Sequence, residues 1–316
     1  MDNRILKIST QTGNIFNEVT DDEKYLYEKF SYLKECGFEA IDYNMDHFLD
    51  CPSIYSGELN DFWDKSLDEL YEYFSHTKNA IEKSGICFSQ AHSSFPLYFE
   101  GKDDFNEYMI MVIEKTIAVC GFLGCPAVVA HPISHEDKER ETEINLAMYR
   151  KMIPAAKKYG VKVCLENTFT TFGGKPTEGS CTDVDEVCRY IDKLNSEACE
   201  DVFGFCLDIG HANLMGRSIK RFITTLGSHL TCLHIHDNDG IYDMHMMPYT
   251  QTRDRGKQNC TDWDGMIDGL RKINYQGNLS FETFRGVETF PNEVEPEVLR
   301  LLSSIGRYFR SRIAER

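Results

Sequence analysis

The stretch that decides the fold is Gly204-Phe205-Cys206-Leu207-Asp208-Ile209-Gly210-His211-Ala212-Asn213-Leu214-Met215-Gly216. Its apolar start is typical of a short buried strand that ends at Asp208. The chain then turns through a glycine and places His211 three residues after the acid. A carboxylate and an imidazole at one strand end are common ligands of divalent metals, so this stretch predicts part of a metal site.

Three other apolar runs finish in the same way, with an acid or a histidine at the end of the strand. They are Val163-Cys164-Leu165-Glu166, Thr231-Cys232-Leu233-His234 and Leu279-Ser280-Phe281-Glu282. We interpret the four strand ends as contributors to one metal centre. This interpretation requires a fold that brings the ends of distant strands together.

Strands and helices alternate along the chain. The patterns predict strands at residues 5–9, 40–43, 86–91, 127–130, 161–165, 204–208, 230–235 and 279–281. Helices are expected at about 21–36, 60–83, 104–122, 137–159, from 183, 218–226, 262–273 and 293–309, and glycines such as Gly85 and Gly160 end them. Eight strand–helix pairs without a biased linker predict the α/β class and a single (β/α)8 TIM barrel domain over residues 1–316. An open doubly wound sheet with an extra lobe is the alternative.

Composition narrows the class of partner and the compartment. The chain of 316 residues has 34 Lys and Arg against 51 Asp and Glu, a net charge of −17, which disfavours nucleic acid because phosphate contacts need clustered cations. The start has too short an apolar run for a signal peptide, and no run is long enough to span a membrane. Twelve cysteines stand singly without a C-x-x-C pair, which indicates reduced thiols. We therefore expect a soluble cytoplasmic protein.

In a (β/α)8 barrel the carboxyl ends of all strands meet at one mouth, so the residues that follow each apolar run can be collected. They form the list His92, His131, Glu166, Asp208 with His211, His234 with His236, and Glu282. A single histidine of this kind is more often a hydrogen-bonded mouth residue than a ligand. So many titratable groups in one cavity require a neutralising cation, which predicts one divalent metal ion, with Mn²⁺, Mg²⁺, Co²⁺ and Zn²⁺ all compatible.

Glu166 and Glu282 come from the fifth and the eighth predicted strand. They would therefore approach a bound substrate from different sides of the mouth. A pair of carboxylates in this position can accept and donate a proton on opposite faces of a substrate whose oxygens a metal polarises. This arrangement favours an isomerase or epimerase of hydroxy-carbonyl compounds.

Several segments together resemble the xylose isomerase-like barrel superfamily, which holds sugar isomerases and epimerases together with the endonuclease IV family. They are Leu165-Glu166-Asn167, Leu207-Asp208-Ile209-Gly210-His211-Ala212, His234-Ile235-His236-Asp237-Asn238, Asp243-Met244-His245, Asp262-Trp263 and Phe281-Glu282. The resemblance to the ketose 3-epimerase branch implies that Glu166, Asp208, His234 and Glu282 hold the metal and that the two glutamates exchange protons. It implies His211 as a substrate contact, and it favours His234 over His236 because the family ligand lies three residues before an acid, here Asp237.

The endonuclease IV branch uses a three-zinc cluster with further histidines and an Asp-x-His pair. Similar residues here are His92, His131, His211, Asp243 and His245, so multi-metal cleavage of a phosphodiester is an alternative function. In the carbohydrate interpretation, His92 and His131 are expected to bind substrate, and His236, Asp243 and His245 could hold an additional metal. A third alternative, also from the superfamily, is a C-glycoside-cleaving subunit that acts with a small partner chain.

The long stretch from Asp237 to Thr261 exceeds the usual length of a connection and is therefore expected to be functional. Its segment 248–257 departs from the shorter Pro-Gly-x-Gly loop of the superfamily and carries Arg253 and Arg255, either of which could bind a substrate hydroxyl, carboxylate or phosphate. A solvated loop is the alternative. The sequence predicts a metal-dependent enzyme that isomerises a carbohydrate, and leaves open the substrate, the metal and whether the chain forms a homo-oligomer.

Overall fold

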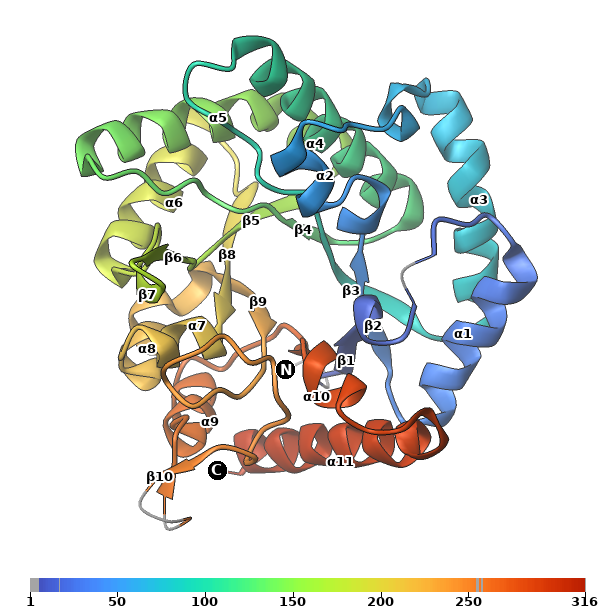
Figure 1. Ribbon diagram of the computed structural model, residues 1–316, viewed down its shortest axis with the longest axis vertical. Coiled ribbons are helices and arrows are strands. Elements are labelled where there is room, and N and C mark those ends of the chain that lie inside the picture. The colour runs from blue at the N-terminus through green and yellow to red at the C-terminus, as the bar shows by residue number, and fades with distance from the viewer. Residues whose placement is uncertain (1–5, 17, 254–255, 257, 316) are drawn as a thin grey trace.

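The computed structural model describes residues 6–16, 18–253, 256 and 258–315. Eight parallel strands form a barrel whose neighbours follow the order β12-β1-β2-β3-β4-β5-β8-β9 (Figure 1). Their bounds are β1 Ile8–Gln11, β2 Ala40–Asn44, β3 Cys87–His92, β4 Ala127–Val129, β5 Lys162–Glu166, β8 Phe203–Asp208, β9 Leu230–His234 and β12 Leu279–Phe281. The predicted (β/α)8 TIM barrel is confirmed.

The barrel closes between its last two strands. Ile235, which follows β9, forms a parallel bridge to Phe281 in β12. The Ile235 N–H donates to the Ser280 carbonyl at 2.9 Å, and the Glu282 N–H donates to the Ile235 carbonyl at 3.2 Å. This contact excludes the open doubly wound sheet and brings Glu282 beside the end of β9.

Helices surround the strands on the outside, as the view along the barrel shows (Figure 1). The surrounding helices are α1 Glu23–Glu35, α3 Leu67–Ser84, α4 Asp103–Leu123, α5 Lys138–Tyr159, α6 Val184–Ala198, α8 Ile219–Leu226, α9 Trp263–Lys272 and α11 Glu295–Ala314. Gly85 and Gly160 follow α3 and α5 with left-handed φ values of +68° and +64°, so the predicted glycine stops are confirmed.

The start of α3 differs from the prediction of about residue 60. Ser66 forms a capping box with Glu69: the Glu69 N–H donates to the Ser66 hydroxyl, and the Ser66 N–H donates to the Glu69 carboxylate. The helix therefore begins at Leu67, after the short 3-10 helix Phe62–Asp64.

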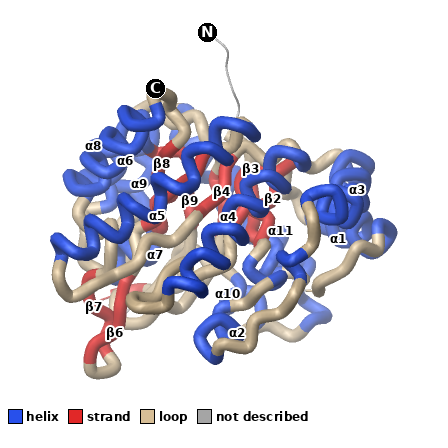
Figure 2. Tube along the Cα trace, turned by 90° about the horizontal axis from the view of Figure 1, so that it is seen from above, coloured by secondary structure: helices blue, strands red, loops and turns tan. Residues whose placement is uncertain are grey.

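Smaller elements were not predicted, and several of them lie at one end of the barrel. In the side view, α2, α10 and the β6–β7 hairpin lie together at that end (Figure 2). Their bounds and those of the other short elements are α2 Cys51–Ser56, α7 Ile209–Leu214, α10 Phe284–Glu288, β6 Phe169–Phe172, β7 Lys175–Glu178, β10 Thr252–Arg253, β11 Gln258–Asn259 and the 3-10 helices Thr12–Asn14, Asp46–Phe48, Gly227–His229 and Asn292–Val294.

All twelve cysteines are free, and eight of them are buried. Within the described part of the chain, every helix is too short or too polar to cross a lipid bilayer. The predicted domain bounds 1–316, and the expected absence of a signal peptide at the start, involve residues outside those described and stay predictions.

Candidate metal centre

The four predicted metal ligands meet at the mouth of the barrel. Glu166, Asp208 and His234 are the last residues of β5, β8 and β9, and Glu282 directly follows β12. One ligand atom from each lies within 4.8 Å of the ligand atoms of the others. The side chains are buried, with residue exposures of 1%, 0%, 0% and 8% in this order. The parallel barrel thus gathers residues that are distant in the sequence, from Glu166 to Glu282.

His234 is the shared contact of the two glutamates. Its Nδ1 lies 2.8 Å from Glu166 Oε1 and 3.3 Å from Glu282 Oε2. Both carboxylates therefore point at one small volume, although they come from different strands.

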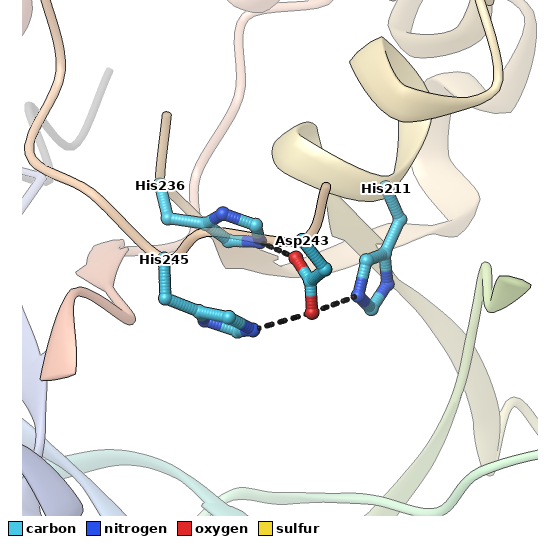
Figure 3. A group of neighbouring side chains, drawn as sticks. All are labelled: His211, His236, Asp243 and His245. Atoms are coloured by element: carbon cyan, nitrogen blue, oxygen red, sulfur yellow. Dashed lines mark hydrogen bonds and ion pairs between the residues drawn. The ribbon is translucent and has the colours of Figure 1, made fainter. Parts of the chain in front are cut away.

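A second group lies beside the first and is formed by His211, His236, Asp243 and His245 (Figure 3). Asp243 Oδ2 is 2.8 Å from His245 Nε2 and 3.6 Å from His211 Nε2, and its Oδ1 is 3.8 Å from His236 Nε2. The stretch 237–261, expected to be functional from its length, supplies Asp243 and His245.

His236 joins the two groups. Its Nε2 lies 3.0 Å from Asp208 Oδ1 and 3.1 Å from Asp208 Oδ2. The ring is completely buried and stacks on His245 at a centroid distance of 4.0 Å. A Cβ added to Gly210 would lie 1.9 Å from His236 Cε1, so the glycine after the strand makes room for this ring.

A third group contains His92 and His131, which share Glu166 with the first group. His92 Nε2 is 3.0 Å from His131 Nε2, and His131 Nε2 is 3.0 Å from Glu166 Oε2. Burial lowers the pKa of His92 to about 3, so its imidazole is neutral near pH 7. Neutral imidazole is the form that binds metals.

The hydrogen bonds of three histidines fix which nitrogen faces the centre. Nδ1 of His92 lies 3.0 Å from the Ser93 carbonyl, Nδ1 of His211 lies 2.8 Å from the Asn167 carbonyl, and Nδ1 of His245 lies 3.0 Å from the Glu282 carbonyl. A carbonyl only accepts, so Nδ1 carries the proton and donates in each ring. In the neutral form of each ring Nε2 is then the nitrogen with the lone pair, and it faces the acidic centre, as in metal-binding histidines whose other ring nitrogen donates to a carbonyl.

The two glutamates have opposite pKa shifts. Burial is the main cause that raises the pKa of Glu282 to about 7. Burial acts on Glu166 as well, but the charges and hydrogen bonds of His234 and His131 outweigh it and hold the pKa of Glu166 well below its usual value. For His234, burial favours the neutral ring, but the acidic groups around it, including Glu166 and Glu282, raise its pKa well above the usual value.

The donor set fits a divalent metal. Three carboxylates and one imidazole form the first group, and burying these carboxylates together is costly without a cation. Glu166, Asp208, His234 and Glu282 would hold the ion, and oxygen-rich sets of this kind suit Mn²⁺, Mg²⁺ and Co²⁺ as well as Zn²⁺. The second group is richer in nitrogen and would favour zinc.

A cavity of about 650 Å³ opens above these groups. His92, His131 and His211, predicted as substrate contacts, line it together with Glu166 and Glu282. The aromatic residues Phe95 and Phe169 also line the cavity, whereas Tyr98 and Phe99 do not.

The two predicted arginines have different outcomes. Arg253 is exposed on β10 and donates to the Cys260 carbonyl at 3.0 Å, and it is not among the residues that line the cavity. Its role in substrate binding stays a prediction. Arg255 lies outside the described residues.

Several residues of the centre were not predicted. The Gln11 amide donates to Glu282 Oε1 at 2.7 Å, and Asp42 Oδ2 lies 3.0 Å from His234 Nε2. Phe284 packs on His245 at a centroid distance of 4.3 Å. Gln11 ends β1 and Asp42 lies inside β2. A polar residue within or at the end of an early strand was therefore the feature of the sequence that could have pointed to them.

Sequence comparison assigns the class. Residues 30–305 match the xylose isomerase-like TIM barrel family, and the chain belongs to this family. The chain is 24% identical over 174 residues to the uncharacterized protein y4fM of Sinorhizobium fredii, covering 55% of this chain and 52% of that protein. It is 27% identical over 184 residues to the probable endonuclease 4 of Cenarchaeum symbiosum, covering 54% of this chain and 62% of that protein. The chain therefore spans only about half to three fifths of these relatives.

Solved structures share the fold over nearly the whole chain. The 3-keto-D-glucoside 4-epimerase YcjR of E. coli has a TM-score of 0.67 at 17% identity, covering 95% of this chain and 99% of that chain. The D-allulose 3-epimerase of Methylomonas sp. has a TM-score of 0.68 at 14% identity, with 98% of both chains covered. The IOLI protein with a bound zinc atom has a TM-score of 0.64 at 19% identity, with 98% of both chains covered. At these identities the likeness concerns the fold.

We predict that Gly210→Ala disrupts the junction of the two groups. Its Cβ overlaps His236, so the free energy of unfolding should fall by about 1–3 kcal/mol, measured by denaturant unfolding. The double variant Gly210→Ala/His236→Ser removes the ring that the methyl group meets. Its loss of unfolding free energy should therefore be smaller than the sum of the losses in the two single variants. Additive losses would contradict this assignment of the contact.

We also predict that metal affinity rises with pH. A cation binds the deprotonated forms of Glu282 and His234, whose pKa values are raised, so binding releases protons and is weaker at low pH. Calorimetric titration of EDTA-treated protein with Mn²⁺ or Zn²⁺ from about pH 5.5 to about pH 8 should show up to a tenfold gain per pH unit for each released proton. Glu282→Gln should flatten the change near pH 7. A constant affinity over this range would contradict the ligand assignment.

Proposed function

We propose that the chain is a divalent-metal-dependent isomerase or epimerase of a carbohydrate. The observation that carries this proposal is the pair Glu166 and Glu282, which reach one nitrogen of His234 from β5 and from the end of β12 and line the same cavity. Bound at this centre, a metal ion supplies stabilisation of negative charge on substrate oxygens.

The two glutamates are suited to different halves of a proton transfer. The pKa of Glu166 is held low, because the nearby histidines outweigh its burial, so its carboxylate is ready to accept a proton from the carbon next to a carbonyl group. In the metal-free protein burial raises the pKa of Glu282 to about 7, so of the two carboxyl groups Glu282 takes up a proton more readily, and we assign to it the donation of a proton to the other face of that carbon. Solvent then returns both groups to their initial states. The expected result of this step is inversion of configuration at that carbon.

The cavity wall supports a neutral polyhydroxylated substrate. Among the described residues that line it there is no lysine and no arginine, so it offers no fixed cation for a phosphate or a carboxylate. Phe95, Phe169 and Phe284 each lie against a histidine of the centre, at centroid distances of 4.3, 5.1 and 4.3 Å. Aromatic faces beside hydrogen-bonding groups are typical of small-molecule pockets of this size. The sugar epimerases of similar fold support the same substrate class.

A test that does not require the final product is hydrogen exchange in D₂O. Proton transfer through Glu166 and Glu282 would replace a carbon-bound hydrogen of the true substrate with deuterium. We expect the metal-loaded protein to catalyse this exchange on at least one member of a panel of neutral ketoses and keto-glycosides, observed by proton NMR. A metal-loaded protein that exchanges none of them would count against the proposal.

Glu166→Gln and Glu282→Gln should each lower this exchange by about 10²–10⁴-fold while the far-UV circular dichroism stays unchanged. Glu136, an exposed glutamate in the loop between β4 and α5, provides the control. Glu136→Gln should keep the activity of the unmodified protein. Retention of full activity in either of the first two variants would remove that residue from the mechanism.

Multi-metal cleavage of a phosphodiester is the second candidate. Among the described residues, ten acids and histidines form adjoining groups that could hold a metal, and Glu166 belongs to more than one of these groups, so the mouth could hold several ions. The relative named probable endonuclease 4 supports this candidate. The net charge of −17 and the absence of lysine and arginine from the described cavity wall weigh against a nucleic-acid substrate.

We predict that zinc-loaded protein does not cleave abasic-site DNA at low salt above the rate of the EDTA-treated protein. Low salt favours nucleic-acid binding, so this condition gives the second candidate its best chance. Cleavage at many turnovers per minute, lost in His92→Ala, would reverse the order of the two candidates. That the chain acts with a small partner chain, or that it forms a homo-oligomer, stays a prediction.

A further inference from the structure

His234 differs from His92, His211 and His245 in the partner of its outer nitrogen, the ring nitrogen that points away from the acidic centre. The rings of His92, His211 and His245 donate outward to backbone carbonyls. The outer nitrogen of His234 is Nε2, and it faces a carboxylate, Asp42 Oδ2, at 3.0 Å. His234 is also the residue on which both glutamates converge.

Asp42 reaches His234 from another part of the barrel. It lies in β2, which is separated from β9 by β12 and β1 around the closed sheet. Both side chains are completely buried. Asp42 is not a member of any group that could hold a metal among the described residues, because the Nε2 that it contacts points away from the centre. Its contact with the centre is therefore through the imidazole.

Other polar groups hold the Asp42 carboxylate in position. The Gln90 amide donates to Asp42 Oδ2 at 2.9 Å and to the Leu233 carbonyl at 3.3 Å, which ties the carboxylate to the strand that carries His234. The Ser280 hydroxyl donates to the same oxygen at 3.4 Å. The interior of a TM barrel is normally filled by bulky apolar residues, so a buried acid with its own donors requires another explanation.

We propose that Asp42 is a positioning residue for metal binding. It accepts the Nε2–H of His234, which leaves Nδ1 free to bind the metal, orients the ring towards Glu166 and Glu282, and makes the imidazole a stronger donor. The inference rests on the metal centre of the proposed function and is independent of the substrate.

The first test is metal affinity. Asp42→Asn keeps the shape of the side chain but removes its charge, and its amide can turn to donate to His234. We expect the dissociation constant for Zn²⁺ and for Mn²⁺, measured by calorimetry on EDTA-treated protein, to rise about 10–100-fold. Ser89→Ala is the matched control, because the Ser89 hydroxyl bonds to Ser9 and to the Ile41 carbonyl in the same buried region without touching Asp42. It should change the affinity less than about twofold.

The second test needs no variant. In zinc-loaded protein labelled with ¹⁵N in histidine, the proton of His234 should be found on Nε2, in a strong hydrogen bond that gives a far-downfield proton signal. A proton on Nδ1 would overturn the inference. So would an Asp42→Asn variant that binds metal as tightly as the unmodified protein, or a Ser89→Ala variant that loses as much affinity as Asp42→Asn. Unmodified protein that binds neither metal would instead overturn the metal centre of the proposed function, and the inference with it.

Discussion

The burial of several acids around His234 is the constraint on which the mouth of this barrel depends. Glu166, Asp208 and Glu282 are almost fully buried and converge within a few ångströms. Carboxylates in such a place raise the energy of the folded chain unless positive charge offsets them. In the metal-free protein protons offset these acids, which the raised pKa values of His234 and Glu282 reflect. A divalent cation bound there would replace those protons, and folding, protonation and metal binding would then be linked at one point.

The sequence predicted the barrel and the convergence of four side chains, Glu166, Asp208, His234 and Glu282, because both follow from local patterns. A short apolar run gives a strand, its last residue faces the mouth, and parallel order brings all such residues together. Asp42 and Gln11 could not be predicted in this way. Their importance comes from contacts across the barrel, to His234 and Glu282, and a strand pattern contains no information about which residue lies opposite. The role of Gly210 was hidden for the same reason, since its small size matters only against His236.

The ligand set alone does not separate the two candidate chemistries. Glu166, Asp208, His234 and Glu282 can serve proton transfer or hydrolysis, because both need a cation that polarises oxygen. What differs is the surrounding wall. The described wall of the cavity combines phenylalanines and histidines without lysine or arginine, which suits a neutral ligand with many hydroxyl groups better than a polyanion. Additional ions in the groups around His131 and Asp243 would supply the missing positive charge, so metal occupancy and substrate charge are coupled properties of this mouth.

The partners of the outer nitrogens add a second level of control. A backbone carbonyl fixes the tautomer of an imidazole but carries no net charge, whereas a carboxylate also increases the electron density on the ring. His92, His211 and His245 have the first kind of partner, and His234 has the second. The strongest imidazole donor is therefore expected where the two glutamates meet. A cation held there by His234 and Asp208 would depend less on Glu166 and Glu282, and in the proposed function this would leave the two carboxylates freer to exchange protons with a substrate.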